Sequence, residues 1–89
     1  MTHIVKRKGH KEEYDERKVY ASIFAACKNV HLNDSEAEFL ADKVAKEITS
    51  WIKEKTEVNY TEIFEKVSEL LNKYNQDASF MYKTHLDVS

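Results

Sequence analysis

The 89-residue sequence contains no proline, one glycine and one cysteine, and these shortages exclude several classes of protein. A single cysteine, Cys27, can form neither an intrachain disulfide nor a cysteine-based zinc site. One glycine cannot build the glycine-rich loop with which Walker and Rossmann proteins surround phosphates through backbone N–H groups. No apolar run approaches the roughly 18 residues that a membrane span needs. We therefore expect a cytoplasmic protein with no membrane partner.

The residues that are present suffice for one small domain over residues 1–89. Hydrophobic residues make up 42% of the chain and charged residues 34%, a balance that supports a core under a well-solvated surface. The net charge is −2, yet residues 1–18 hold six Lys and Arg against four Asp and Glu. A local basic patch on an otherwise acidic chain favours a small anion as ligand over a long nucleic acid.

The pattern of polar and apolar residues predicts an α+β fold, with a small antiparallel hairpin or three-stranded sheet packed on about four helices. Two short extended runs at residues 3–8 and 10–14 flank Gly9, which suits a hairpin turn that requires a positive φ. A third short strand is expected at residues 56–58, against the hairpin.

Capping signals and apolar periodicity predict the helices. Asp15 suits an N-cap, with Tyr14 and Val19 placed to form a hydrophobic staple around it. Asn59 and Glu62 have the spacing of a capping box, and a regular apolar stripe follows them. The expected helices cover residues 16–29, about 35–53, 60–74 and 77 to about 85.

Groups that could support catalysis or hold a metal are scattered along the chain. The histidines share no metal-ligand spacing and lie in different segments: His3, His10, His31 and His85. No serine has the flanking glycines of a nucleophile elbow. Cys27 follows apolar residues at helical spacing, which is typical of a buried structural thiol. We therefore predict neither an enzyme nor a redox or metal cofactor.

The remaining candidate is a phosphate site built from cationic side chains. Lys18, in the first turn of the first helix, can close over the same anion as Lys6 and Arg7. Neighbours on a strand point to opposite faces, so Lys6 and Arg7 share a ligand only at the edge of the ribbon. Glu12 and Asp15 are the nearest acceptors for an exocyclic amine or a ribose hydroxyl. The same basic run is, however, common in a solvated hairpin whose edge is protected by charge.

Two sequence motifs stand out, one at residues 4–19, which leads into the first predicted helix, and one at residues 58–71, which follows the second predicted helix. The chain opens with Ile4-Val5-Lys6-Arg7-Lys8-Gly9, followed by Glu12 and the helix start from Tyr14 to Val19. A V-x-x-x-E-I-x-x-x-V-x-x-x-L pattern follows at Val58, Glu62, Ile63, Val67 and Leu71. In this order and spacing the segments resemble the ATP-cone, the regulatory module of ribonucleotide reductase large subunits and of the reductase repressor.

The resemblance implies a small sheet with four helices that binds ATP or dATP, with or without Mg²⁺. Its nucleotide-binding positions correspond here to Ile4, Val5, Lys6, Arg7, Glu12, Asp15, Lys18, Tyr60 and Phe64. It implies that the three cations contact phosphates, that the two carboxylates recognise adenine, and that the two aromatic rings wall the ribose. The chain departs from the family pattern at Lys8, where Asp is usual, and in the bulk of those two rings.

The leading hypothesis is therefore an allosteric sensor of adenine nucleotides, acting through homo-oligomer formation or through a fused or associated effector protein. The sequence shows no effector, so we expect a free-standing regulator or a part of a longer protein. The alternative is a nucleic-acid or protein interaction module without nucleotide binding, in which Lys6, Arg7, Lys8 and Lys11 contact backbone phosphates. Acidic helices and the lack of aromatic residues within this basic cluster make nucleic acid the less favoured partner.

Overall fold

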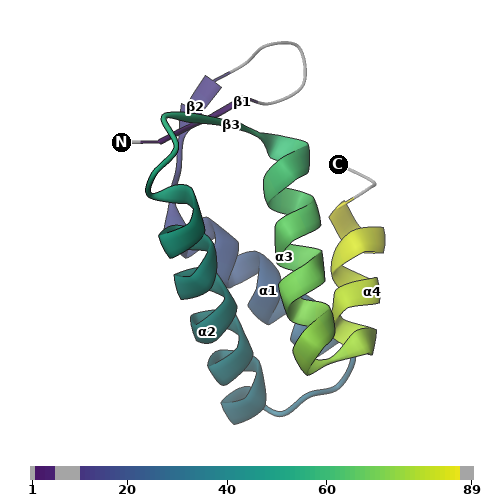
Figure 1. The fold of residues 1–89 in the computed structure, drawn as a ribbon. Helices are drawn as coiled ribbons and strands as arrows, with labels where there is room; N and C mark the ends of the chain where they lie inside the picture. The colour runs from purple at the N-terminus through teal and green to yellow at the C-terminus, as the bar shows by residue number, and fades with distance from the viewer. Residues whose placement is uncertain (1, 6–10, 87–89) are drawn as a thin grey trace.

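The computed structural model describes residues 2–5 and 11–86, with side chains as far as residue 84, and within them shows a three-stranded sheet at one end of four helices (Figure 1). The elements are β1 (His3–Val5), β2 (Lys11–Glu13), α1 (Glu16–Asn29), α2 (Asp34–Ile52), β3 (Glu57–Asn59), α3 (Tyr60–Tyr74) and α4 (Gln76–Leu86). The predicted α+β class is confirmed, and each helix ends within one residue of its expected bounds. The expected turn at Gly9 and the strand residues 6–8 and 10 lie outside the described residues.

The sheet is mixed, with strand order β2-β1-β3. The central strand β1 pairs antiparallel with β2, as the hairpin predicted, and parallel with β3. Parallel neighbours need a long crossover connection, and here α1 and α2 supply it. Ile4 lies between Glu12 and Val58 in one row across the three strands, and the two apolar members of this row are buried. That face of the sheet therefore closes the core.

The four helices enclose a single apolar core. In sequence order, α1 packs against α2 and α4, and α3 packs against the same two helices. The largest fully buried side chains come from α1, α2 and α3: Ile23, Cys27, Val44, Ile48, Ile52, Val67 and Leu71. Burial of an aliphatic side chain of this kind contributes about 1.5–3 kcal/mol. This core holds the sheet end and the helix starts in fixed relative positions.

Two predicted helix starts are confirmed. The Asp15 carboxylate accepts the Arg17 backbone N–H at 3.0 Å, as an N-cap does, and both Tyr14 and Val19 pack against the core. At the start of α3, the Glu62 carboxylate accepts the Asn59 backbone N–H at 3.3 Å, as in the predicted capping box. Both helices that follow a strand therefore begin where local sequence signals place them.

The residue that ends the turn after α1 has a left-handed backbone conformation although it is not glycine. His31 has a φ of 67°, and its N–H reaches the Lys28 carbonyl at 3.0 Å while the Leu32 N–H reaches the Cys27 carbonyl at 3.1 Å. This pair of bonds is the Schellman pattern, in which glycine usually occupies the left-handed position. A histidine there holds a backbone conformation that is unfavourable for an L-residue with a Cβ.

A buried threonine ties the first strand to the second helix. The Thr2 hydroxyl lies 3.1 Å from the carbonyl oxygen of Ile52, the last residue of α2, and 2.7 Å from that of Lys55, just beyond the helix. The Ile52 carbonyl also accepts the Lys55 backbone N–H at 2.9 Å, so the hydroxyl adds to a turn that closes the end of the helix. The start of β1 is thereby fixed to α2.

Candidate functional site

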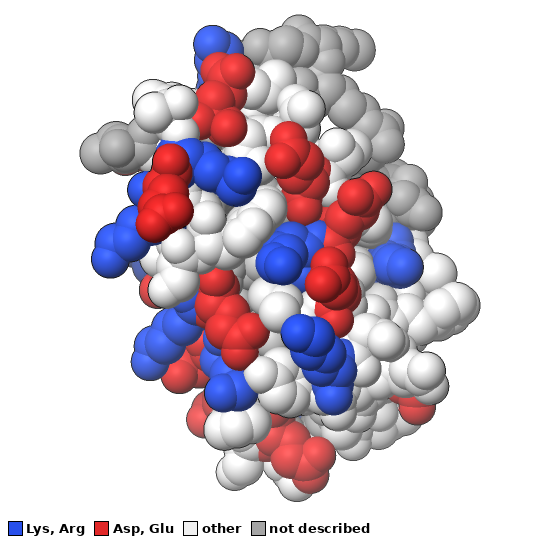
Figure 2. All heavy atoms as spheres, viewed as in Figure 1, with Lys and Arg blue, Asp and Glu red and all other residues white. Residues whose placement is uncertain are grey.

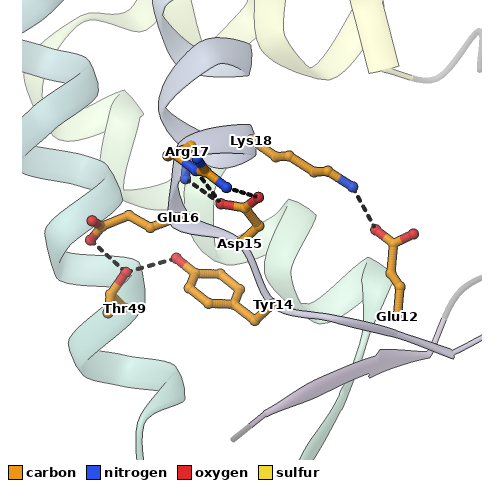
Figure 3. Close-up of polar contacts among 7 residues, drawn as sticks. All are labelled: Glu12, Tyr14, Asp15, Glu16, Arg17, Lys18 and Thr49. Carbon is orange, nitrogen blue, oxygen red and sulfur yellow. Dashed lines mark hydrogen bonds and ion pairs between the residues drawn. The ribbon is translucent and has the colours of Figure 1, made fainter.

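The candidate site lies where β2 ends and α1 begins (Figure 3). Glu12 occupies the same row of the sheet as the buried residues Ile4 and Val58, so its side chain leaves the face that covers the core. A carboxylate at this position is unexpected, because charged groups are rarely placed on the core side of a sheet without a partner. The Lys18 Nζ lies 3.7 Å from the Glu12 Oε1.

Lys18 is also placed against ordinary preference. It belongs to the first turn of α1, where the helix dipole disfavours a cation. Its side chain is 70% exposed and points toward the strand rather than along the helix (Figure 3). A helix start combined with an exposed lysine suits an anion, since backbone N–H groups and the ammonium attract the same charge. Glu12 and Lys18, each at a position that local structural preference disfavours, therefore lie next to each other.

Asp15 completes the acidic part of the junction. Besides capping α1, its carboxylate receives the Arg17 side chain, with Nε at 3.3 Å and Nη2 at 3.4 Å. The hydrogen bonds from the Arg17 side chain and backbone hold the pKa of Asp15 below its usual value. The carboxylate is therefore ionised at neutral pH. It can only accept hydrogen bonds, for example from an amine or a hydroxyl group.

An open hollow of about 460 Å³ lies over this junction. Its volume falls within the range of about 300–1,000 Å³ that is common for small-molecule sites. The residues that line it come from β2 and the first turn of α1: Glu12, Glu13, Tyr14, Asp15, Arg17 and Lys18. The structure thus brings together three of the predicted site residues, the two carboxylates and Lys18, around one open space.

The other predicted site residues fall into three groups. Ile4 is buried beneath the site, and Val5 is half-buried on the opposite face of the sheet. Lys6 and Arg7 lie outside the described residues. Tyr60 and Phe64 lie on the first turns of α3, directly after the strand that pairs with β1, and both are half-buried.

The aromatic residues of α3 pack against one another and against α4. The ring centroids of Tyr60 and Phe64 are 6.3 Å apart, and those of Phe64 and Tyr82 are 5.6 Å apart. Burial raises the pKa of Tyr82 strongly, and the nearby phenols of Tyr60 and Tyr14 raise it further. The two aromatic residues predicted to wall the ribose are therefore packed against a buried residue of α4.

Tyr14 and Thr49 extend the junction in a way that the sequence did not indicate. The Tyr14 hydroxyl lies 2.8 Å from the Thr49 hydroxyl, which in turn donates to the Glu16 carboxylate at 2.7 Å. Burial raises the pKa of Tyr14, with smaller contributions from the charges of Glu16 and Asp15, while its bond to Thr49 acts in the opposite direction. A threonine in an amphipathic helix is ordinary, so no local signal marks it.

Charge on the visible surface does not form a basic stripe. Figure 2 shows acidic and basic side chains interspersed over the face that carries α2 and α3. Lys11 lies on the outer face of the sheet, where its Nζ is 3.0 Å from a carboxylate oxygen of Glu57. It is the one described member of the basic cluster on which the nucleic-acid alternative depends.

The described part of the chain contains neither a candidate membrane-spanning helix nor a candidate metal-binding cluster. None of its helices is both long and apolar enough to cross a membrane. Its His, Cys, Asp and Glu side chains form no group of three or more that could hold a metal ion.

The fold is a small α+β domain with an open polar hollow at the start of one helix. A comparison with models of protein families matches the ATP cone domain over residues 2–81. The chain therefore belongs to the ATP-cone family, as the sequence motifs predicted, and is a nucleotide-binding regulatory module. A comparison with curated protein sequences finds no significant match.

Proposed function

We propose that this domain is an allosteric sensor that binds ATP or dATP at the β2–α1 junction. The observation that carries the proposal is the pairing of Glu12 with Lys18, since each stands where the fold alone would disfavour it. Residues that oppose local structural preference and meet in an open hollow are typical of functional sites. The family membership supplies the ligand class.

In this proposal the cations and the carboxylates have different roles. Lys18, with Lys6 and Arg7 of the hairpin, binds the phosphates, and the exposed N-terminal end of α1 adds its backbone dipole. Glu12 and Asp15 accept hydrogen bonds from the adenine amine or a ribose hydroxyl, as ionised carboxylates can. Mg²⁺ enters with the triphosphate, since phosphate oxygens are ordinary ligands of that ion.

The hydrophobic contacts of the nucleotide come from the sheet and from α3. Ile4, whose side chain lies on the same face of the sheet as Glu12, forms the floor of the site, and Val5, whose side chain lies on the opposite face, contributes only its backbone. Tyr60 and Phe64 provide the wall beside the ribose. The parallel pairing of β3 with β1 supports this arrangement, because it brings the start of α3 beside the strand that carries Ile4.

Binding acts on function by changing self-association or the activity of a fused or associated effector in the cytoplasm. The nucleotide acts through β2 and the first turn of α1, because these segments carry Glu12 and Lys18. A ligand that binds one arrangement of this junction more tightly favours that arrangement, which another chain can then recognise.

A calorimetric titration with ATP, dATP and GTP tests the proposal. We expect the adenine nucleotides to bind more tightly than GTP, because the carboxylates at the junction accept the adenine amine and repel the guanine carbonyl. Glu12→Gln should reduce this preference, and Glu57→Gln is its control, since Glu57 also pairs with a lysine but on the outer face of the sheet. Absence of binding at millimolar nucleotide, or equal effects of the two substitutions, would overturn the proposal.

A further inference from the structure

The Thr49 hydroxyl joins α2 to the β2–α1 connection and to the first turn of α1 (Figure 3). Its oxygen lies 2.8 Å from the Tyr14 hydroxyl, 2.7 Å from the Glu16 carboxylate and 3.0 Å from the Ala45 carbonyl oxygen. A hydroxyl has one proton to donate and two lone pairs to accept with. The arrangement that uses these groups best has Tyr14 donating to Thr49 and Thr49 donating to the Glu16 side chain.

The two side chains held by Thr49 flank the N-cap of α1. Tyr14 immediately precedes Asp15, and Glu16 immediately follows it, so one hydroxyl on α2 fixes the backbone on both sides of the cap. Two residues further along lies Lys18, whose ammonium reaches back to Glu12. The direction in which Lys18 leaves the helix is therefore set by the orientation of this first turn.

The same stretch of α2 also holds the start of β1. The Thr2 hydroxyl bonds to the carbonyls of Ile52 and Lys55, and the Thr2 carbonyl receives the Tyr14 backbone N–H at 3.0 Å. The C-terminal part of α2 thus anchors both strands of the hairpin at the ends nearest the helices. Thr49 is the point at which this anchor contacts the first turn of α1.

We propose that Thr49 is a positioning residue for the nucleotide site, which holds Asp15 and Lys18 in the orientation that binds an adenine nucleoside triphosphate. The inference rests on the proposed function, because it concerns the same site. Thr49 touches no nucleotide in this account and acts through Tyr14 and Glu16. Small displacements of a binding group weaken binding strongly, so a supporting hydroxyl can affect affinity from a distance.

Thr49→Val tests the inference, because valine keeps the branched shape and removes the hydroxyl. We expect the Kd for ATP, measured by calorimetry, to rise about tenfold, on the scale of one lost hydrogen bond to a charged group. Thr49→Ser restores the hydroxyl and should bring the Kd back to within about twofold of the unsubstituted domain. Failure of serine to restore affinity would overturn the positioning role.

The control is Ser79→Ala on α4. The Ser79 hydroxyl is buried and donates to the Ser68 carbonyl oxygen at 2.8 Å, which joins α4 to α3 away from the junction. This substitution removes a comparable hydrogen bond and should leave the Kd within about twofold. Equal weakening by Ser79→Ala and Thr49→Val would show that lost stability alone accounts for the effect and would overturn the inference.

A double-mutant cycle with Lys18→Ala shows whether Thr49 acts through Lys18. If it does, the Thr49→Val substitution should change the Kd by much less in the Lys18→Ala background than in the unsubstituted domain. Fully multiplicative effects would contradict this route. Tyr14→Phe provides the same comparison if Thr49→Val does not fold, since it removes only one hydroxyl.

The failure of the proposed function has a different signature. If the unsubstituted domain binds no adenine nucleotide, both the function and the positioning role are wrong. If it binds ATP and Thr49→Val binds it equally well while folded, the function stands and the positioning role alone is wrong.

Discussion

Replacing Lys18 with alanine should show whether this lysine contributes to nucleotide binding or to the stability of the fold. Three contributions to the free energy of unfolding follow from the structure. The lost ion pair with Glu12 has a separation of 3.7 Å and a lysine that is 70% exposed. Pairs of this kind contribute about 0–1 kcal/mol. Removal of a cation from the first turn of α1 raises the free energy of unfolding by about 0.3–1 kcal/mol. Alanine also favours a helix slightly more than lysine does, which raises it a little further.

These contributions nearly cancel, so we expect urea denaturation to show a change within about 0.5 kcal/mol. The Kd for ATP should instead rise about 10- to 100-fold, because a charge-assisted bond to phosphate contributes about 1.5–3 kcal/mol. Circular dichroism for the unfolding curve and calorimetry for the Kd, on the same samples, provide the comparison.

Lys46→Ala is the matched control. Lys46 is 68% exposed on α2, and its Nζ lies 3.1 Å from a carboxylate oxygen of Asp42, so it resembles Lys18 in exposure and pairing but lies in the middle of a helix. It should change neither the stability nor the Kd appreciably. A Lys18→Ala domain that loses more than about 1.5 kcal/mol of stability while binding ATP normally would show that Lys18 serves the fold and not the ligand.

Two other predictions concern the fold and its response to acid. His31→Gly should raise the free energy of unfolding by about 1 kcal/mol, because glycine adopts the left-handed conformation at the end of α1 without a Cβ penalty; an unchanged or lower urea midpoint would contradict this. Asp15→Asn should flatten the acid limb of the stability profile. The pKa of Asp15 is lowered in the folded state, so its contribution is complete above the unfolded value of 3.8 and is lost as the pH falls through the lower folded value. Parallel acid limbs in the two domains, measured by denaturation between pH 2 and 6, would contradict the assignment.

The helices were predictable because their signals are local. Asp15 with its staple, and Asn59 with Glu62, lie within five residues of the helix starts that they determine. The apolar stripe of α3 likewise follows from a short repeat in the sequence. Local rules of this kind do not depend on which elements pack together, so they hold before the fold is known.

The sheet and the end of α1 show where local rules are insufficient. A short strand around Val58 was expected against the hairpin, but its parallel pairing with β1 depends on a crossover through two helices. The left-handed conformation of His31 carries no glycine to mark it. Both features are determined by the packing of distant segments.

The same distinction applies to the site. Glu12, Asp15 and Lys18 are close in the sequence, and a strand that leads into a helix brings them together, so this part was predictable. Thr49 lies more than thirty residues away from Tyr14 and Glu16, within an ordinary amphipathic helix, and only the packing of α1 on α2 reveals its contacts. The nucleotide-binding roles of all the predicted site residues, Glu12, Asp15 and Lys18 included, remain predictions.

The most direct test of the central claim is a two-dimensional ¹H–¹⁵N NMR titration of the labelled domain with ATP, with GTP as the comparison. We expect ATP to shift the amide signals of Glu12 and of residues 15–18 at concentrations where GTP has little effect. Signals from the far end of α2, around Phe39, should stay in place. Shifts that are absent at millimolar ATP, or that centre on the far ends of the helices, would contradict a nucleotide site at the β2–α1 junction.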